Sequence, residues 1–215
     1  MKSLFLGIAL IIVVGIGGLI YRNAVERPNR PVACRMDALV CPDGTAVGRT
    51  GPSCTFSACP PPNVSLVDVG IAFALLDGFS TAEILDSTGA AAYENKPTSV
   101  STIADKIIIR RYAIAPTSTA LATIQETAIG GASGEPVPSI AYSSTVIGSN
   151  RFTVVSIERF EAVIDTAYYL ARSSDVLRFD AIDREVMNWT EPNLDVSKLP
   201  AHSALLGLLT TLQGE

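Results

Sequence analysis

The pattern of apolar and polar side chains divides the 215-residue sequence into three unlike stretches. Residues 4–20 are all apolar or glycine, with no polar side chain to mark a solvent-facing stripe. A segment rich in Gly, Pro and Cys follows, and residues 64–215 then alternate between short strand-like and helix-like patterns. We therefore expect a membrane helix, a small cysteine module and one folded domain.

The apolar stretch at residues 4–20 predicts a transmembrane helix. Its seventeen residues span roughly 26 Å at about 1.5 Å of rise per residue, which is close to the hydrocarbon thickness of about 30 Å. Tyr21 and Arg22 follow directly, and such side chains are common at the membrane interface. We expect an anchor over residues 1–22 that contacts the lipid bilayer through residues 4–20, followed by a juxtamembrane linker over residues 23–33.

A cleaved signal peptide is the main alternative for this stretch. Signal peptides favour small residues at the last and third-last positions before the cut. A cut after Ala24 would place Arg22 at the third-last position. We therefore favour an uncleaved signal anchor.

All four cysteines of the chain lie within residues 34–59, separated by six, twelve and four residues. Confinement of an even number of cysteines to a short segment rich in Gly and Pro is typical of a disulfide module, because such a segment cannot bury a core. A four-thiolate zinc site and free thiols are the alternatives. The disulfide candidates, with three possible pairings, are Cys34, Cys41, Cys54 and Cys59.

This segment resembles a short module of uncharacterised, membrane-anchored envelope proteins of bacteria. The resemblance rests on Cys-Pro-Asp-Gly at residues 41–44, Val-Gly-Arg at 47–49, Gly-Pro at 51–52, and on Cys54, Phe56 and Cys-Pro at 59–60. It implies a location outside the cytoplasm. It brings no catalytic residues and no known ligand.

Two features of the sequence predict opposite orientations in the membrane. The positive-inside rule sets Lys2 against Arg22, Arg27, Arg30 and Arg35 and favours a cytoplasmic body. Disulfides form in oxidising compartments outside the cytosol and favour the reverse. We give the cysteines more weight and expect a single-pass protein whose C-terminal domain lies outside the cytoplasm.

Three consecutive prolines within residues 60–63 predict a stiff spacer, because polyproline is extended. The main domain is then expected at residues 64–215. Its strand-like segments, the last two joined by a short hairpin loop, are residues 64–76, 106–113, 151–163, 166–172 and 176–182. Their order predicts an antiparallel meander.

Two helices are expected to pack against this sheet. Residues 117–131 follow a proline and end at two glycines, with Leu121, Ile124 and Ala128 on one face. Residues 200–213 carry a leucine stripe at helical spacing, which we interpret as core packing. The fold class is therefore α+β: an antiparallel sheet packed with an internal and a C-terminal helix, after the transmembrane helix and the disulfide module.

The order of elements in the main domain is similar to that of the PsbP-like family of α/β sandwich domains. The resemblance also rests on IAFALLDGF at residues 71–79 and ALLGLLTTLQ at residues 204–213. It implies an antiparallel sheet covered by helices and a binding or assembly role. A membrane anchor is not part of the family's usual pattern.

Composition excludes several classes of protein. With 48% hydrophobic and 17% charged residues, the chain is neither disordered, nor a coiled coil, nor a highly basic nucleic-acid binder. Residues 1–62 hold six basic and three acidic side chains, whereas residues 63–215 hold ten and eighteen. The main domain thus carries a net charge of −8, which opposes nucleic acid as a partner.

Candidate chemistry in the domain is sparse. The single histidine, His202, is expected to be a partly exposed residue at the start of the last helix. It is not expected to form a nucleophile–base pair with its neighbour Ser203, because adjacency on a helix does not bring the two side chains to hydrogen-bond distance. The acidic residues between 175 and 195 are interpreted as a solvated surface. Arg178 is grouped with ordinary exposed ion pairs. We therefore predict no catalytic residues, no metal site and no cofactor.

Two places are predicted as contact surfaces. Trp189, the only tryptophan, lies with Asn188 in the long connection before the last helix, and exposed aromatic side chains in such loops often form binding sites. Arg110 and Arg111 are predicted as a possible anion or partner patch.

The sequence as a whole predicts a membrane-anchored extracytoplasmic domain with a non-catalytic role, either binding a protein partner in the envelope or stabilising an assembly. A ligand-binding or sensory domain, with a pocket between sheet and helix near Trp189, is the second hypothesis. A carboxylate-based enzyme is the third.

Overall fold

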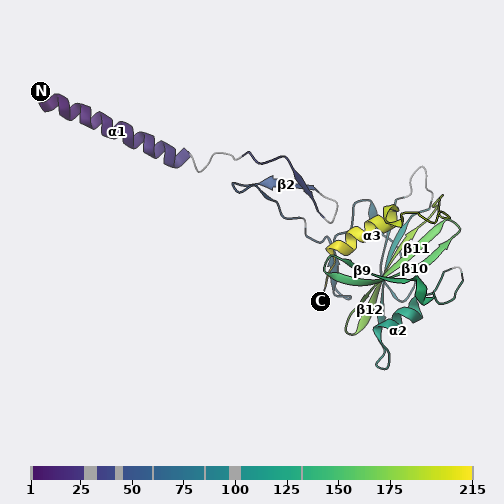
Figure 1. The fold of residues 1–215 in the computed structure, drawn as a ribbon. Coiled ribbons are helices and arrows are strands. Elements are labelled where there is room, and N and C mark those ends of the chain that lie inside the picture. The colour runs from purple at the N-terminus through teal and green to yellow at the C-terminus, as the bar shows by residue number, and fades with distance from the viewer. Residues whose placement is uncertain are drawn as a thin grey trace. The chain divides into compact units, whose positions relative to one another are not determined.

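A computed structural model describes residues 2–26, 33–41, 46–59, 61–84, 86–96, 103–131 and 133–214. The described residues divide into two units (Figure 1). The N-terminal unit holds the described residues of 1–39 and 46–58, and the C-terminal unit holds those of 40–45 and 59–215.

The N-terminal unit begins with helix α1, Lys2–Glu26, which contains the predicted apolar stretch. Its described apolar side chains, such as those of Ile11 and Val13, are exposed. Measured over the described residues, no helix reaches the length and apolarity that a membrane crossing requires. The anchor at residues 4–20 therefore stays a prediction.

The cysteine segment forms a small three-stranded sheet in the order β1 (Ala38–Val40), β2 (Ala46–Thr50), β3 (Thr55–Phe56). Its four cysteines form two disulfides, Cys34–Cys54 and Cys41–Cys59, with Cα–Cα distances of 5.3 and 5.6 Å. The predicted disulfides are confirmed, and the pairing joins the first cysteine to the third and the second to the fourth. The turn expected at residues 42–44 lies outside the described residues.

Arg49, the arginine of the Val-Gly-Arg sequence, connects three parts of this module. Its guanidinium donates to Asp37 Oδ1 at 2.8 Å and to the carbonyl of Cys54 at 3.0 Å, and it lies 4.0 Å from the ring centroid of Phe56. The hydrogen bond from Arg49 lowers the pKa of Asp37. Arg49 therefore has a structural role in the cysteine module.

The C-terminal unit is built on a seven-stranded antiparallel sheet in the order β6-β7-β8-β12-β11-β10-β9. The strands, in chain order, are β6 (Phe79–Thr81), β7 (Gly89–Asn95), β8 (Lys106–Ala113), β9 (Tyr142–Ile147), β10 (Asn150–Phe160), β11 (Val163–Ala171) and β12 (Asp175–Asp183). A second sheet has three strands in the order β13 (Gln213–Gly214), β5 (Ile71–Phe73), β4 (Val64–Leu66). Short 3-10 helices, η1 and η2, occupy Ser139–Ala141 and Val196–Lys198.

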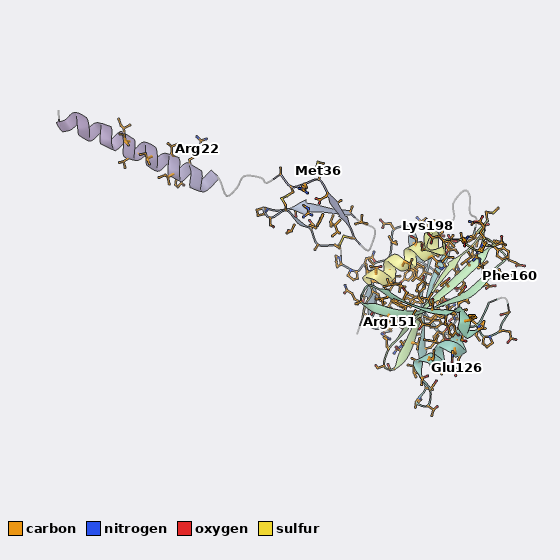
Figure 2. The ribbon with its side chains drawn as sticks, in the orientation of Figure 1. Arg22, Met36, Glu126, Arg151, Phe160 and Lys198 are labelled. Carbon is orange, nitrogen blue, oxygen red and sulfur yellow. A yellow bond between two sulfur atoms is a disulfide. The ribbon has the colours of Figure 1, made fainter. Side chains whose placement is uncertain are left out.

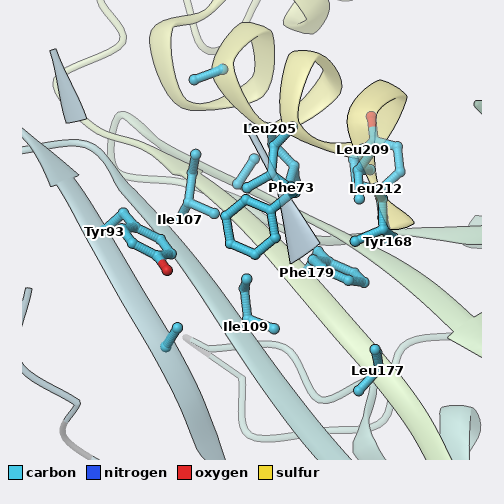
Figure 3. Close-up of a cluster of buried hydrophobic side chains, with 14 of the residues drawn as sticks. Phe73, Tyr93, Ile107, Ile109, Tyr168, Leu177, Phe179, Leu205, Leu209 and Leu212 are labelled. Atoms are coloured by element: carbon cyan, nitrogen blue, oxygen red, sulfur yellow. The ribbon is translucent and has the colours of Figure 1, made fainter. Parts of the chain in front are cut away.

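Helices lie on opposite sides of the large sheet, as Figure 1 shows for α2 (Ala120–Thr127) and α3 (Pro200–Thr211). The core on the α3 side includes Phe73 and Phe179, which Figure 3 shows beside the leucines of α3. The core on the α2 side is smaller and includes Ile124 and Tyr169. The sheet is thus buried on both faces, and the leucine stripe packs as predicted.

Several predicted elements match the observed ones, and others do not. Residues 106–113 form β8 as expected. The single strand expected at residues 64–76 is two strands, since the chain turns at Gly70, where φ is +72° and glycine is favoured. Strands β7 and β9 were not predicted. The sequence of β7 is rich in alanine and contains no β-branched residue, which is unusual for a strand. In β9 the Tyr, Thr, Val and Ile residues are typical of strands, so this strand could have been predicted.

Strand β12, at the centre of the sheet, carries four charged side chains, all of them buried: Asp175, Arg178, Asp180 and Asp183. Burying a charge is unfavourable unless it is paired and hydrogen-bonded. Asp175 and Asp180 pair with arginines of β8, and Asp183 pairs with His202 of α3. Arg178 pairs with Asp180 on the same strand and donates to the carbonyl of Thr127 on α2. The expectation that this acidic region is a solvated surface, with Arg178 in an exposed ion pair, is therefore wrong for β12.

Asp183 caps helix α3 from outside the helix. Its carboxylate accepts from the backbone N–H of Ala201 at 2.7 Å, from that of His202 at 3.3 Å, and lies 2.5 Å from Nδ1 of His202. The residue at the N-cap position, Leu199, makes no side-chain cap hydrogen bond, so β12 supplies the acceptor that helix N-termini require. His202 is fully buried, which corrects the expectation of partial exposure.

Asp175, at the start of β12, fixes the turn between β4 and β5. It accepts from Arg172 at 2.6 and 2.7 Å and from Arg111 at 2.6 Å. The same two arginines donate to the backbone carbonyls of Val69 and Asp68 in that turn. The hydrogen bonds from Arg172, and then those from Arg111, lower the pKa of Asp175.

We predict that Asp175→Asn lowers the free energy of unfolding by about 3 kcal/mol near neutral pH, because two guanidinium groups lose their buried counter-charge. The folded-state pKa lies below the usual value of 3.8. The carboxylate therefore stabilises the fold above the unfolded-state pKa, and this stability is lost as the pH falls through the folded-state pKa. Urea unfolding of the full chain at several pH values should show the difference from wild type shrinking below about pH 4.

Asp195→Asn is the matched control, because Asp195 pairs with Lys198 on the exposed surface and such pairs contribute little. An Asp175→Asn effect that stays constant from neutral to acidic pH would contradict this account of the charge.

Candidate functional site

One candidate site is an exposed aromatic surface made by the β10–β11 hairpin and the loop that follows β12. Phe160 at the end of β10 is 48% exposed, and Met187 is 93% exposed. The ring of Phe160 meets that of Trp189 edge to face at 6.4 Å. We call Phe160, Met187, Asn188 and Trp189 the contact surface; Figure 2 labels Phe160.

Arg159 ties the loop to the hairpin. Its guanidinium donates to the backbone carbonyls of Trp189 and Glu191. The backbone N–H of Val186 also donates to the carbonyl of Ala162 at 3.0 Å. The aromatic side chains are therefore carried by two segments that are fastened to each other, and the loop is not held at its ends alone.

The hairpin turn beneath Phe160 has an unfavourable backbone conformation. Phe160 pairs with Val163, which leaves a two-residue turn in which Glu161 and Ala162 have φ of +48° and +62°. Such turns strongly prefer Asn and Gly, and a left-handed conformation costs other residues roughly 1–2 kcal/mol each. Strain of this kind is often found at binding sites.

The predicted site residues are divided between two places. Trp189 and Asn188 belong to the contact surface, where Trp189 is partly exposed and Asn188 is exposed. Arg110 and Arg111 do not form one patch, because successive strand residues point to opposite faces. Arg111 points toward Asp175, whereas Arg110 points toward Asp86 and Asp180 on the other face.

A second candidate site is a groove of about 720 Å³ between α2 and the end of β8. Most of its lining residues carry hydroxyl groups, and Glu126 of α2 adds a carboxylate. The lining residues with hydroxyl groups are Thr88, Tyr112, Thr117, Ser118, Thr119, Thr123 and Thr127. The sequence predicted a pocket near Trp189. This groove is a different one, because it lies against α2 and Trp189 is not part of its lining.

A chain of hydrogen bonds and ion pairs joins two residues of this groove through the protein interior. Thr88 donates to Asp86 at 2.6 Å, and Arg110 bridges Asp86 and Asp180. Arg178 then donates to Asp180 at 2.6 Å and to the carbonyl of Thr127 at 2.6 Å. We call this series, from Thr88 to Thr127, the ionic chain.

The ionic chain alters the acidity of its members and neighbours. The hydrogen bond from Thr88, and the Arg110 charge, lower the pKa of Asp86. Burial and the nearby Asp180 carboxylate raise the pKa of Asp165 well above its usual value, so Asp165 keeps its proton to a higher pH than an exposed aspartate. Arg110 and Arg178 both donate to Asp180, which lies at the centre of the ionic chain.

The Asp183–His202 pair resembles part of a catalytic triad, but its surroundings differ from those of an active site. Both side chains are sealed from solvent, and Nε2 of His202 has no hydrogen-bond partner among the described residues. A nucleophile would have to lie at that nitrogen. Within the described part of the chain, no group of three or more His, Cys, Asp or Glu side chains is arranged to hold a metal ion.

The hydroxyl-lined groove was not among the predicted sites. The threonines of 117–127 stand at positions 117, 119, 123 and 127, and three of them are spaced by four residues, which places them on one helix face. This spacing could have indicated a hydroxyl-lined surface on α2.

Comparisons with known proteins give distant structural neighbours and no family. No family model matches the chain, and a search among curated proteins finds no match. A crystal structure from Bacteroides thetaiotaomicron VPI-5482 covers 67% of this chain at 8% identity and a TM-score of 0.44, and the chain spans only 45% of that structure. Cyanobacterial PsbP (CyanoP) from Synechocystis sp. PCC 6803 covers 74% of this chain and 98% of its own length, at 10% identity and a TM-score of 0.44.

Proposed function

We propose that this protein is a membrane-tethered, extracytoplasmic domain that binds another protein through the contact surface. The observation that carries the proposal is the exposed cluster of Phe160, Met187 and Trp189 on a backbone fixed by Arg159. Large exposed apolar side chains grouped on one rigid surface are typical of protein interfaces.

The proposed location follows from the N-terminal part of the chain. Two disulfides indicate folding in an oxidising compartment. The described apolar side chains of α1 are exposed in the protein alone, and residues 4–20 carry no polar side chain. Such a helix needs an apolar environment, which a bilayer would supply.

The charge around the contact surface favours a basic partner. Glu161 lies in the hairpin turn and Glu191 in the loop, and both are exposed. Arg159 directs its guanidinium to backbone carbonyls of the loop. A partner with an apolar centre and basic rim would complement this surface.

We predict that a photo-crosslinking amino acid at Met187 captures a protein partner in intact cells, whereas the same substitution at Ile140 does not. Both positions are almost fully exposed, at 93% and 92%, but only Met187 belongs to the contact surface. Cross-linked species are detected by their mass on gels and identified by mass spectrometry.

Adding Phe160→Asp should abolish the Met187 cross-link without lowering the melting temperature by more than a few degrees, because Phe160 is half exposed. Equal capture from Met187 and Ile140, or capture that persists with Phe160→Asp, would refute the proposed surface.

A separate prediction tests location. The cysteines should react with a thiol reagent only after reduction, and protease added to intact cells, with any outer membrane permeabilised, should degrade the C-terminal domain. The chain should also sediment with membranes and be released by detergent but not by high salt, since apolar burial holds it. Reactive thiols in a protease-protected chain would show that the location is wrong.

A further inference from the structure

We propose that the groove between α2 and β8 binds a saccharide. This inference is independent of the proposed protein contact, because it concerns different residues: Figure 2 shows Glu126 of α2 and Phe160 of the contact surface at separate places on the domain.

Hydrogen bonds within the protein fix how the groove's hydroxyl groups are presented. Thr88 donates its hydrogen to Asp86, Thr123 donates to the carbonyl of Thr119, and Thr127 donates to that of Thr123. A hydroxyl that has given its hydrogen away still accepts through its lone pairs. These three threonines therefore act toward a ligand as acceptors.

Other lining residues supply donors. Thr119 Oγ accepts from the backbone N–H of Ala122 at 3.2 Å, which leaves its hydrogen for a ligand. Thr117, Ser118 and Tyr112 bring further hydroxyl groups. A groove with acceptors on some walls and donors on others suits a ligand whose own groups do both, and sugar hydroxyls are of that kind.

The charge of the groove disfavours an anionic ligand. Glu126 brings a carboxylate to the lining. Arg111 also lines the groove, but its guanidinium donates to Asp175 and to the carbonyl of Asp68. The C-terminal domain as a whole is also acidic. The Glu126 carboxylate can accept hydrogen bonds from ligand hydroxyl groups, because a carboxylate also accepts from uncharged donors.

The ionic chain holds the groove in shape. It ends at Thr88 on one side and at the carbonyl of Thr127 on the other, and its central residue, Asp180, is fully buried. Buried ionic groups seldom add stability over an apolar packing of equal volume. In this domain their hydrogen bonds join β8, β12 and α2 at defined positions. Lining groups that are already in place cost a ligand less ordering on binding. A volume of about 720 Å³ lies within the usual range for small-molecule sites.

The test is saturation-transfer NMR on the full chain with maltose and N,N′-diacetylchitobiose as probes. Wild type should transfer saturation to at least one of them. Ala122→Trp, which fills the groove, should abolish the transfer, whereas Leu121→Trp should not, because Leu121 lies on the same helix, is 56% exposed and is not part of the lining.

Both variants are compared with wild type for melting temperature. If Ala122→Trp does not fold, Thr117→Trp, at an exposed position in the loop before α2, blocks the same groove. No transfer from wild type to either saccharide, or transfer that persists in the blocked variant, would overturn the proposal. Spermidine is included as a third probe, and binding of spermidine alone would also overturn it in favour of an ammonium ligand.

Discussion

The structure of the C-terminal domain depends on the pairing of buried charges on one strand. β12 is the central strand of the sheet and is covered on both faces, yet it carries Asp175, Arg178, Asp180 and Asp183. A buried charge without a partner is costly enough to unfold a small domain. Each pairing therefore fixes a neighbouring element: Asp183 the start of α3, Arg178 the end of α2, and Asp175 the β4–β5 turn.

The same pairings place the groove proposed to bind a saccharide. Arg178 and Asp180 belong to the ionic chain, so the residues that hold α2 on the sheet also set the wall that faces β8. The contact surface, by contrast, is fixed locally by Arg159 and the strained turn. Two surfaces with different supports would allow a protein partner and a small ligand to be bound independently.

Much of the fold could be predicted from the sequence. The meander strands and the leucine stripe of α3 were readable because apolar spacing reports which side chains are buried. The role of Asp183 could not be predicted, because sequence spacing does not show that a carboxylate on one element will cap a helix on another. Likewise, charged residues are exposed more often than buried, so the sequence alone predicts that the acidic residues of β12 lie on the surface. The Trp189 loop can be proposed as a contact surface from its sequence, because a lone aromatic residue in a long connection is conspicuous. The groove cannot be distinguished in the same way, because threonines also serve as ordinary surface residues.

The most direct test of the central claim is hydrogen exchange on full-length Asp183→Asn and Arg178→Met variants. We predict that Asp183→Asn accelerates amide exchange in the first turn of α3 and leaves α2 unchanged, whereas Arg178→Met accelerates exchange at the end of α2 and leaves α3 unchanged. Exchange that rises equally in both helices in each variant, or in neither, would contradict the claim that the charges of β12 hold the two helices separately.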